Sequence, residues 1–234
     1  MNNLIKKIIS SSSLQLMIQD DEVNRLARFS QNLLDHGVER GLTSLTDRED
    51  IVRELIVDSL GAKPFIQGPC KVADLGSGSG VPGLPLAIVS PESNFVMVES
   101  QNRKARWIEE QITALNLPKA TTLAKRIEEV GQVPQWREQF DFVVAKALAP
   151  LPSLIELALP LLKTNGLLLA YKGIKLSEEL DLSKNALKNL FARVEEIFTY
   201  DLSGRERKIC VIKKLKATPK IYPRRVGMAQ HNPL

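Results

Sequence analysis

The sequence predicts an α/β fold, a mostly parallel sheet of seven strands with helices on both faces. Two observations indicate it. From residue 71 onward, short apolar runs alternate with amphipathic stretches, as strands and helices do in such folds. The last two apolar runs follow one another directly, which predicts an antiparallel pair at the end of the sheet.

The first 65 residues predict helices instead. Apolar residues recur at helical spacing between Leu16 and Leu34, and Gly37 is a plausible stop. Asp47 offers an N-cap for a second helix that ends near Gly61. We therefore expect three parts, a helical cap over 1–65, the main α/β domain over 66–216 and a basic tail over 217–234.

Within the main domain, each element can be assigned from its pattern. The expected strands are 72–75, 94–99, 120–125, 140–147, 166–173, 192–200 and 207–214. The expected helices are 85–89, 103–116, 151–162 and 176–190. With 234 residues, the chain can form one full domain with a small appendage.

Composition narrows the class of protein. No window approaches 18 consecutive apolar residues, so we expect no membrane span, and the N-terminus lacks the cleavage site of a signal peptide. Two cysteines, Cys70 and Cys210, and two histidines make a structural zinc site unexpected. We expect a cytoplasmic protein with reduced thiols and no metal.

Basic residues are concentrated at the C-terminal end. Residues 205–234 hold nine of the 32 Lys and Arg residues, but only one of the 27 acidic residues, Glu206. A basic extension beside a domain of opposite charge indicates a polyanionic partner, with a solvated tail as the alternative.

A glycine-rich segment follows the first expected strand. It reads Asp74-Leu75-Gly76-Ser77-Gly78-Ser79-Gly80 and precedes a helix, so its backbone can turn sharply and approach a ligand closely. Ligands of open α/β sheets bind at this edge, the carboxyl ends of the strands. Glu99 ends the second strand, where a carboxylate can accept hydrogen bonds from both ribose hydroxyls.

The spacing separates two kinds of cofactor. A dinucleotide loop has the pattern G-x-G-x-x-G, which places a pyrophosphate at the helix N-terminus. Here the pattern is G-x-G-x-G and Asp74 precedes it, and that carboxylate would repel a pyrophosphate but suits a sulfonium amino acid. The pattern therefore favours S-adenosylmethionine and a methyltransferase. A nucleotide-binding enzyme and a glycine turn without a ligand remain the alternatives.

The segment continues as Val81-Pro82-Gly83-Leu84-Pro85-Leu86, and from here the chain resembles a family. The family is the bacterial 16S ribosomal RNA guanine-N7 methyltransferases, first named glucose-inhibited division protein B. Further matching segments are Glu99-Ser100 with Arg103-Lys104, 126–129, 145–149, 169–173, and the tail segments 222–227 and 232–234. The resemblance covers residues 20–234, and its order and spacing are more specific than any single motif.

The resemblance implies a Rossmann-like class I methyltransferase fold that transfers a methyl group from S-adenosylmethionine to N7 of a guanosine in 16S rRNA. The expected cofactor-binding residues, taken from the loop and from the family motifs together, are Asp74, Gly76, Gly78, Gly80, Val81, Glu99, Ile127, Glu128 and Lys146. Ile127 and Glu128 match the segment that brackets the adenine. Lys146 stands where the family has an arginine, which keeps the charge but loses the bidentate geometry.

Methylation at guanine N7 needs no general base, because N7 is an acceptor without a proton. We therefore expect no catalytic acid–base residue, and the enzyme's task is to align N7 with the methyl group. Two other chemistries lack their residues. The segment after residue 146 has no Asn-Pro-Pro-aromatic loop for amine methylation, and neither cysteine is suited to attack a cytosine.

RNA contact is expected from five basic residues, Lys172, Arg205, Arg207, Arg224 and Arg225. The expected partner is 16S rRNA or the small ribosomal subunit, and the protein is expected to be a monomer. Two alternatives stay open, a methyltransferase acting on another RNA, a small molecule or a protein, and a cofactor- or RNA-binding module without catalysis.

Overall fold

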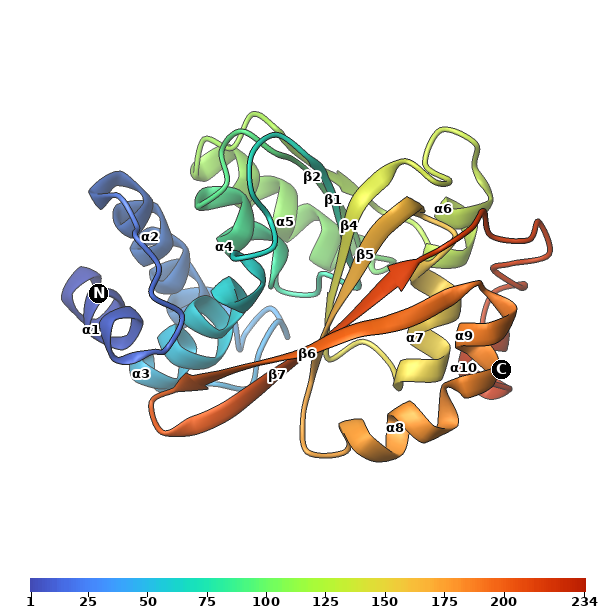
Figure 1. Ribbon diagram of the computed structural model, residues 1–234. Helices are drawn as coiled ribbons and strands as arrows, with labels where there is room; N and C mark the ends of the chain where they lie inside the picture. The colour runs from blue at the N-terminus through green and yellow to red at the C-terminus, as the bar shows by residue number, and fades with distance from the viewer.

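The computed structural model describes all 234 residues, and its centre is a seven-stranded sheet in the order β3-β2-β1-β4-β5-β7-β6 (Figure 1). The strands are β1 (Lys71–Leu75), β2 (Asn94–Val98), β3 (Ala120–Leu123), β4 (Phe140–Lys146), β5 (Leu162–Lys172), β6 (Ala192–Leu202) and β7 (Arg205–Lys214). The first five are parallel, and β7 runs antiparallel to β5 and β6. The predicted fold class and the terminal antiparallel pair are confirmed.

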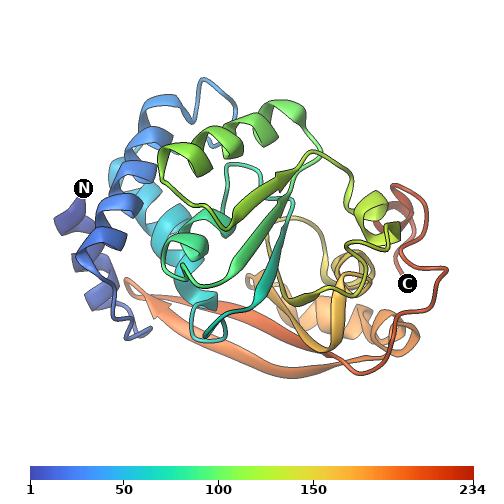
Figure 2. The ribbon, with the colours of Figure 1, turned by 90° about the horizontal axis from the view of Figure 1, so that it is seen from above.

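Helices cover both faces of the sheet (Figure 2). They are α4 (Gly83–Ile88), α5 (Asn102–Ala114), α6 (Ile127–Gln132), α7 (Leu151–Ala158), α8 (Leu176–Leu182), α9 (Lys184–Asn189) and α10 (Met228–His231). Successive strand residues point to opposite faces. Phe95 and Met97 of β2 join one apolar core, whereas Val96 and Val98 join the other. The sheet therefore separates two cores.

The N-terminal layer lies on one face of the sheet, on the same side as α4 and α5. It consists of α1 (Asn2–Ser11), α2 (Asp20–His36), α3 (Arg48–Asp50), a π-helix (η1, Ile51–Val57) and a 3-10 helix (η2, Asp58–Ala62). The predicted helix N-cap at Asp47 is confirmed, since the Asp47 side chain accepts a hydrogen bond from the Asp50 amide at 3.0 Å. The helix that begins after Asp47 is not regular, because α3 continues into η1 and then η2. Hydroxyl groups of Tyr171 and Tyr200 donate to the Ser59 and Asp58 carbonyls, which satisfies them from outside the helix.

Several expected boundaries were wrong. The first long helix begins at Asp20 rather than near Leu16, because Gln19 caps it with Glu22. The stretch 176–190 divides at Ser183, whose hydroxyl bonds to the Glu179 carbonyl at 2.6 Å. Residues 205 and 206 were expected to precede the last strand but lie inside β7, and the short helices α6 and α10 were missed.

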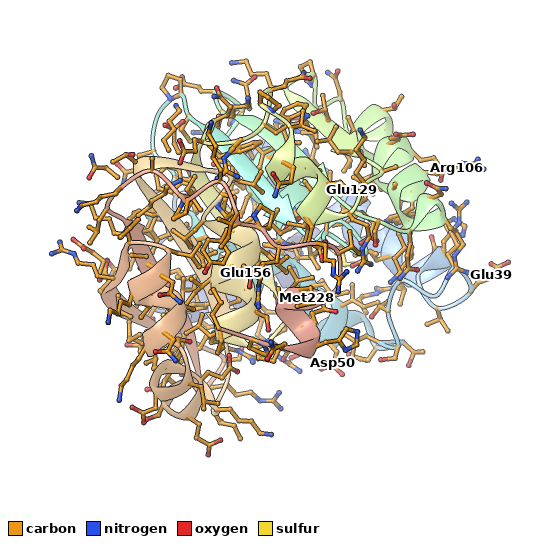
Figure 3. All side chains as sticks on the ribbon, turned by 90° about the vertical axis from the view of Figure 1, so that its right-hand side faces the viewer. Glu39, Asp50, Arg106, Glu129, Glu156 and Met228 are labelled. Atoms are coloured by element: carbon orange, nitrogen blue, oxygen red, sulfur yellow. The ribbon has the colours of Figure 1, made fainter.

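The C-terminal segment 217–234 packs along the domain (Figure 3). Arg137 donates to the carbonyl oxygens of Thr218 and Tyr222, at 2.9 and 2.7 Å. Further on, Glu156 of α7 is fully buried and binds Arg224 through both carboxylate oxygens, at 2.9 and 2.6 Å. These contacts hold α10 against α7. Figure 3 shows Glu156 of α7 beside Met228 of α10.

Gly61 of the N-terminal layer packs closely against Tyr200 of β6. A Cβ at this position would lie 2.7 Å from Cε1 of Tyr200, a ring that is itself buried and bonded to Asp58. We expect Gly61→Ala to lower the free energy of unfolding by about 1–3 kcal/mol, the usual cost of overfilling a packed core. Urea denaturation measures this, with Gly173→Ala as control because a Cβ there meets nothing within 4 Å. An unchanged midpoint for Gly61→Ala would contradict the packing.

Candidate active site

The glycine loop lies between β1 and α4. Three of its glycines have left-handed backbone angles, with φ of 67° at Gly76, 56° at Gly78 and 98° at Gly80. Residues with a Cβ rarely adopt these backbone angles, so the turn requires glycine. The Gly76 and Ser77 amides donate to the Val98 carbonyl at 2.8 and 3.3 Å. The loop is therefore tied to the end of β2.

Asp74 lies behind the loop and is fully buried. Its Oδ2 accepts from the Gly83 amide at 3.0 Å, whereas its Oδ1 has no hydrogen-bond partner. Burial, together with the nearby Glu99 charge, raises the pKa of this carboxyl from 3.8 to about 7, against the lowering effect of the hydrogen bond from the Gly83 amide. Asp74 thus joins the end of β1 to the start of α4.

Trp107 of α5 supports the loop from the side. It is almost fully buried, and its Nε1 donates to the Ser79 carbonyl at 2.9 Å. Phe29 of α2 lies beyond the loop, 3.5 Å from where a Cβ on Gly80 would be. The N-terminal layer and α5 therefore fix the loop's outer side.

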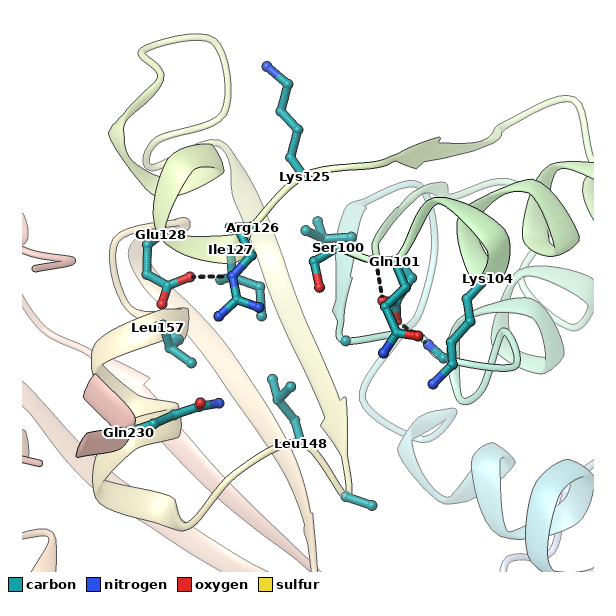
Figure 4. A pocket seen from close by; sticks show the side chains of 15 residues that line it. Ser100, Gln101, Lys104, Lys125, Arg126, Ile127, Glu128, Leu148, Leu157 and Gln230 are labelled. Atoms are coloured by element: carbon teal, nitrogen blue, oxygen red, sulfur yellow. Dashed lines mark hydrogen bonds and ion pairs between the residues drawn. The ribbon is translucent and has the colours of Figure 1, made fainter. Parts of the chain in front are cut away.

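A cavity of about 350 Å³ opens in front of the loop (Figure 4). Its walls come from the loop, the end of β2, the start of α5, the β3–α6 turn, the end of β4, α7 and α10. The lining residues are Gly76, Gly78, Val98, Glu99, Ser100, Gln101, Lys104, Lys125, Arg126, Ile127, Glu128, Ala147, Leu148, Leu157 and Gln230. The cavity sits at the carboxyl ends of the parallel strands, where ligands of such sheets bind.

Glu99 is one of two carboxylates that line this cavity. Its Oε2 accepts from the Gly78 amide at 3.0 Å, and its Oε1 accepts from the Gln101 amide at 2.8 Å. Each carboxylate oxygen has further acceptor capacity, so the group can also take hydroxyl donors from a ligand. The two amides hold it in one orientation.

The structure brings together five of the nine expected cofactor residues. Gly76, Gly78, Glu99, Ile127 and Glu128 all line the cavity. Glu128 Oε1 also accepts from the Gly227 amide at 2.9 Å, which ties α6 to the C-terminal segment.

The other four expected residues lie outside this lining. Asp74 is behind the loop, as described above. Gly80 and Val81 pack beneath it, and a Cβ on Gly80 would collide with Leu84.

Lys146 faces a different cavity, of about 250 Å³, beside Tyr171, Tyr200 and Arg207. Its ammonium pairs with Asp58 and donates to the Glu54 carbonyl, and it lies 5.7 Å from the centre of the Tyr171 ring. These partners belong to the N-terminal layer, so Lys146 links that layer to β4.

The five expected RNA-binding residues differ in how free their charges are. Lys172 is paired with Glu179 at 2.6 Å, and Arg224 with Glu156. Arg207 binds both carboxylate oxygens of Glu54, at 2.7 and 2.8 Å. Arg205 and Arg225 are exposed.

Sequence reasoning missed several lining residues. Lys104, Lys125 and Arg126 carry positive charge around the cavity, and Figure 4 shows Lys125 pointing away from it and Arg126 into it. Gln230 reaches the cavity from α10. The motif segments near residues 103 and 126 were a signal for the basic residues, but nothing local marked Gln230.

These residues fit S-adenosylmethionine. Its ribose diol suits Glu99, its adenine suits the apolar side chains of Ile127 and Leu157, and its cationic amino acid end suits a loop backed by a buried carboxylate. A side chain at Gly76 would occupy the approach, since a Cβ there would lie 2.5 Å from Leu148. No group of three or more His, Cys, Asp or Glu side chains is placed to hold a metal ion. None of the helices has the length and apolar character to cross a membrane.

Comparisons with known proteins agree with this geometry. Residues 22–210 match the family described as rRNA small subunit methyltransferase G. The chain is 35% identical to ribosomal RNA small subunit methyltransferase G of Desulfitobacterium hafniense, over 97% of this chain and 95% of that protein. It is 42% identical to the protein of that name from Deinococcus radiodurans, over 86% and 82%. A methyltransferase structure from Aquifex aeolicus, described as dependent on S-adenosylmethionine, shares the fold, with a TM-score of 0.54 and 17% identity over 74% of this chain and 97% of that one.

The buried Asp74 predicts a pH-dependent stability of the ligand-free protein. Because burial raises the pKa of Asp74 from 3.8 to about 7, the folded state keeps a proton between these pH values that the unfolded state has released. Binding this proton stabilises the folded state at low pH, and the stabilisation is lost as pH rises towards 7. Asparagine cannot ionise. The free energy of unfolding of the wild type minus that of Asp74→Asn should therefore fall between about pH 4 and pH 8, by up to about 4 kcal/mol.

Urea unfolding at several pH values tests this, with the exposed Asp181→Asn as control. A difference between wild type and Asp74→Asn that does not change with pH would show that Asp74 titrates normally.

Proposed function

Because the chain belongs to the rRNA small subunit methyltransferase G family, we propose that it transfers a methyl group from S-adenosylmethionine to N7 of a guanosine in 16S ribosomal RNA. The observation that carries the proposal is the glycine loop with Glu99 and an adjoining cavity, in a chain that matches this family over residues 22–210. We further propose that the protein acts in the cytoplasm as a monomer, without a metal.

In this proposal, the loop and two carboxylates hold the cofactor. Glu99 accepts from the ribose hydroxyls, and its bonds to the Gly78 and Gln101 amides keep it in place. Ile127 and Glu128 bracket the adenine. Gly76 and Gly78 let the backbone approach the amino acid end. Asp74, Gly80 and Val81 act from behind, by fixing the loop's shape.

The reaction needs positioning rather than proton transfer. Bound S-adenosylmethionine supplies a methyl group on a positively charged sulfur. The N7 lone pair of guanine forms the new bond to carbon while the sulfur–carbon bond breaks and leaves its electron pair on sulfur, so the positive charge passes to the purine. No proton moves, and the chain's task is to exclude water and to align the two partners.

Basic side chains, some exposed and some lining the cavity, suit an RNA backbone. Lys125, Arg205 and Arg225 are exposed, and Lys104 and Arg126 line the cavity itself. We propose that these residues contact phosphates, which would make RNA affinity depend strongly on salt. Four of the expected residues could contribute only in part, since each already has a carboxylate partner: Lys172, Arg205, Arg207 and Arg224.

Labelled methyl transfer tests the proposed function. We expect the protein, mixed with undermodified small-subunit RNA or subunits and methyl-labelled cofactor, to yield labelled N7-methylguanosine after RNA digestion. Gly78→Ala should lose this activity, because alanine is strained at a φ of 56°. Label on protein or on small molecules alone would refute the RNA substrate, and tight cofactor binding without any transfer would indicate a binding module.

Glu99 can be tested by cofactor binding alone. Glu99→Gln keeps the size of the side chain but turns one acceptor into a donor that faces a backbone amide. We expect the dissociation constant for S-adenosylhomocysteine to rise at least about tenfold, because hydrogen bonds to a charged group contribute about 1.5–3 kcal/mol. Calorimetry measures this, with the exposed Glu109→Gln on α5 as control. Equal affinities would rule out a role for Glu99 in ribose binding.

A further inference from the structure

A second cavity, of about 320 Å³, adjoins the cofactor cavity. The two share Ala147 and Leu148, the residues that follow β4. Its lining includes the apolar residues Pro150 and Leu154 and the ring of Tyr171. Its volume lies within the range of small-molecule pockets, roughly 300–1,000 Å³.

Two charged side chains stand at one end of this cavity, Lys172 of β5 and Glu179 of α8. They are largely buried, with 8% and 22% of the side chain exposed, and they form an ion pair of 2.6 Å. The other polar group of the wall is used elsewhere, because the Tyr171 hydroxyl donates to Ser59 and accepts from the Ala62 amide.

The hydrogen bonds of this pair leave one donor and one acceptor unused. Glu179 Oε2 accepts from Lys172 and from the Leu151 amide, both at 2.6 Å, while its Oε1 has no partner. The Lys172 ammonium has three donors, of which one goes to Glu179 and one to the Ala149 carbonyl at 2.8 Å. A free N–H and a free carboxylate oxygen therefore lie side by side.

We infer that this cavity receives the target guanine and that Glu179 reads its identity, an inference that rests on the proposed function. Enzymes that act on a base extrude it from its stack and read its Watson–Crick edge. Guanine presents an O6 acceptor beside N1–H and N2–H₂ donors, which matches the free donor of Lys172 beside the free oxygen of Glu179. Adenine presents the opposite order. N7 adjoins O6 on the side away from N1, so it stays free towards the wall shared with the cofactor cavity.

One substitution separates this role from a structural one. In Glu179→Gln, the amide oxygen can keep both bonds now made by Oε2, and the amide nitrogen replaces the free Oε1 with a donor. The hydrogen bonds to the Leu151 amide and to Lys172 can therefore be kept, while the group that faces guanine changes from an acceptor to a donor. The matched control is Glu178→Gln, the exposed neighbour on the same helix.

The guanosine that the wild type methylates is first mapped in an RNA substrate. We then measure kcat/KM for methyl transfer to this RNA and to the same RNA with inosine at the mapped position. Inosine lacks the N2 amine. We expect the wild type to prefer guanosine about tenfold, and Glu179→Gln to lose about tenfold on guanosine while its preference falls to near one. Glu178→Gln should behave as the wild type.

Three results would overturn the inference, namely a wild type that does not distinguish inosine, a Glu179→Gln variant as active as the wild type, or a variant that is slower with the preference unchanged. Failure of the proposed function looks different, since the wild type itself would then transfer no methyl group to guanosine.

Discussion

The hydrogen bond between the buried Asp74 carboxylate and the Gly83 amide is the constraint on which the site depends. It closes a loop that would otherwise be a flexible run of glycines, and it does so at the point where β1 ends and α4 begins. Glu99 adds a second fixed point by binding the Gly78 amide from the end of β2. Two carboxylates on neighbouring strands thus define one backbone surface. Burial raises the pKa of Asp74 to about 7, and a cationic ligand beside it would favour the charged form of the carboxylate.

The two ends of the chain complete this surface. On one side, Asn32 of α2 binds Gln111 of α5 at 2.7 Å, and α5 in turn carries the tryptophan that supports the loop. On the other side, Glu128 binds the Gly227 amide and brings Gln230 to the cavity wall. The C-terminal segment is basic, but part of its charge neutralises buried Glu156 rather than facing solvent. The C-terminal segment therefore forms part of the cavity wall and also adds positive charge to the surface.

Sequence predicted the parts of the molecule that depend on local pattern. The alternation of strands and helices, the terminal antiparallel pair, the glycine turn and the acid after β2 all follow from neighbours in the chain, and the structure has each of them. Contacts between distant segments could not be read in this way. Lys146 ends β4 as expected, but its ammonium pairs with the buried Asp58 of the N-terminal layer. Gln230 and Glu179 reach cavities only once the chain has folded back.

The account places the cofactor in the cavity between the glycine loop and α10. A crystal structure of the protein with S-adenosylhomocysteine tests this most directly. The account predicts electron density for the ligand in that cavity, with both ribose hydroxyls within hydrogen-bond distance of the Glu99 carboxylate and the adenine against Ile127. Density in another cavity, or a ribose that faces away from Glu99, would contradict it.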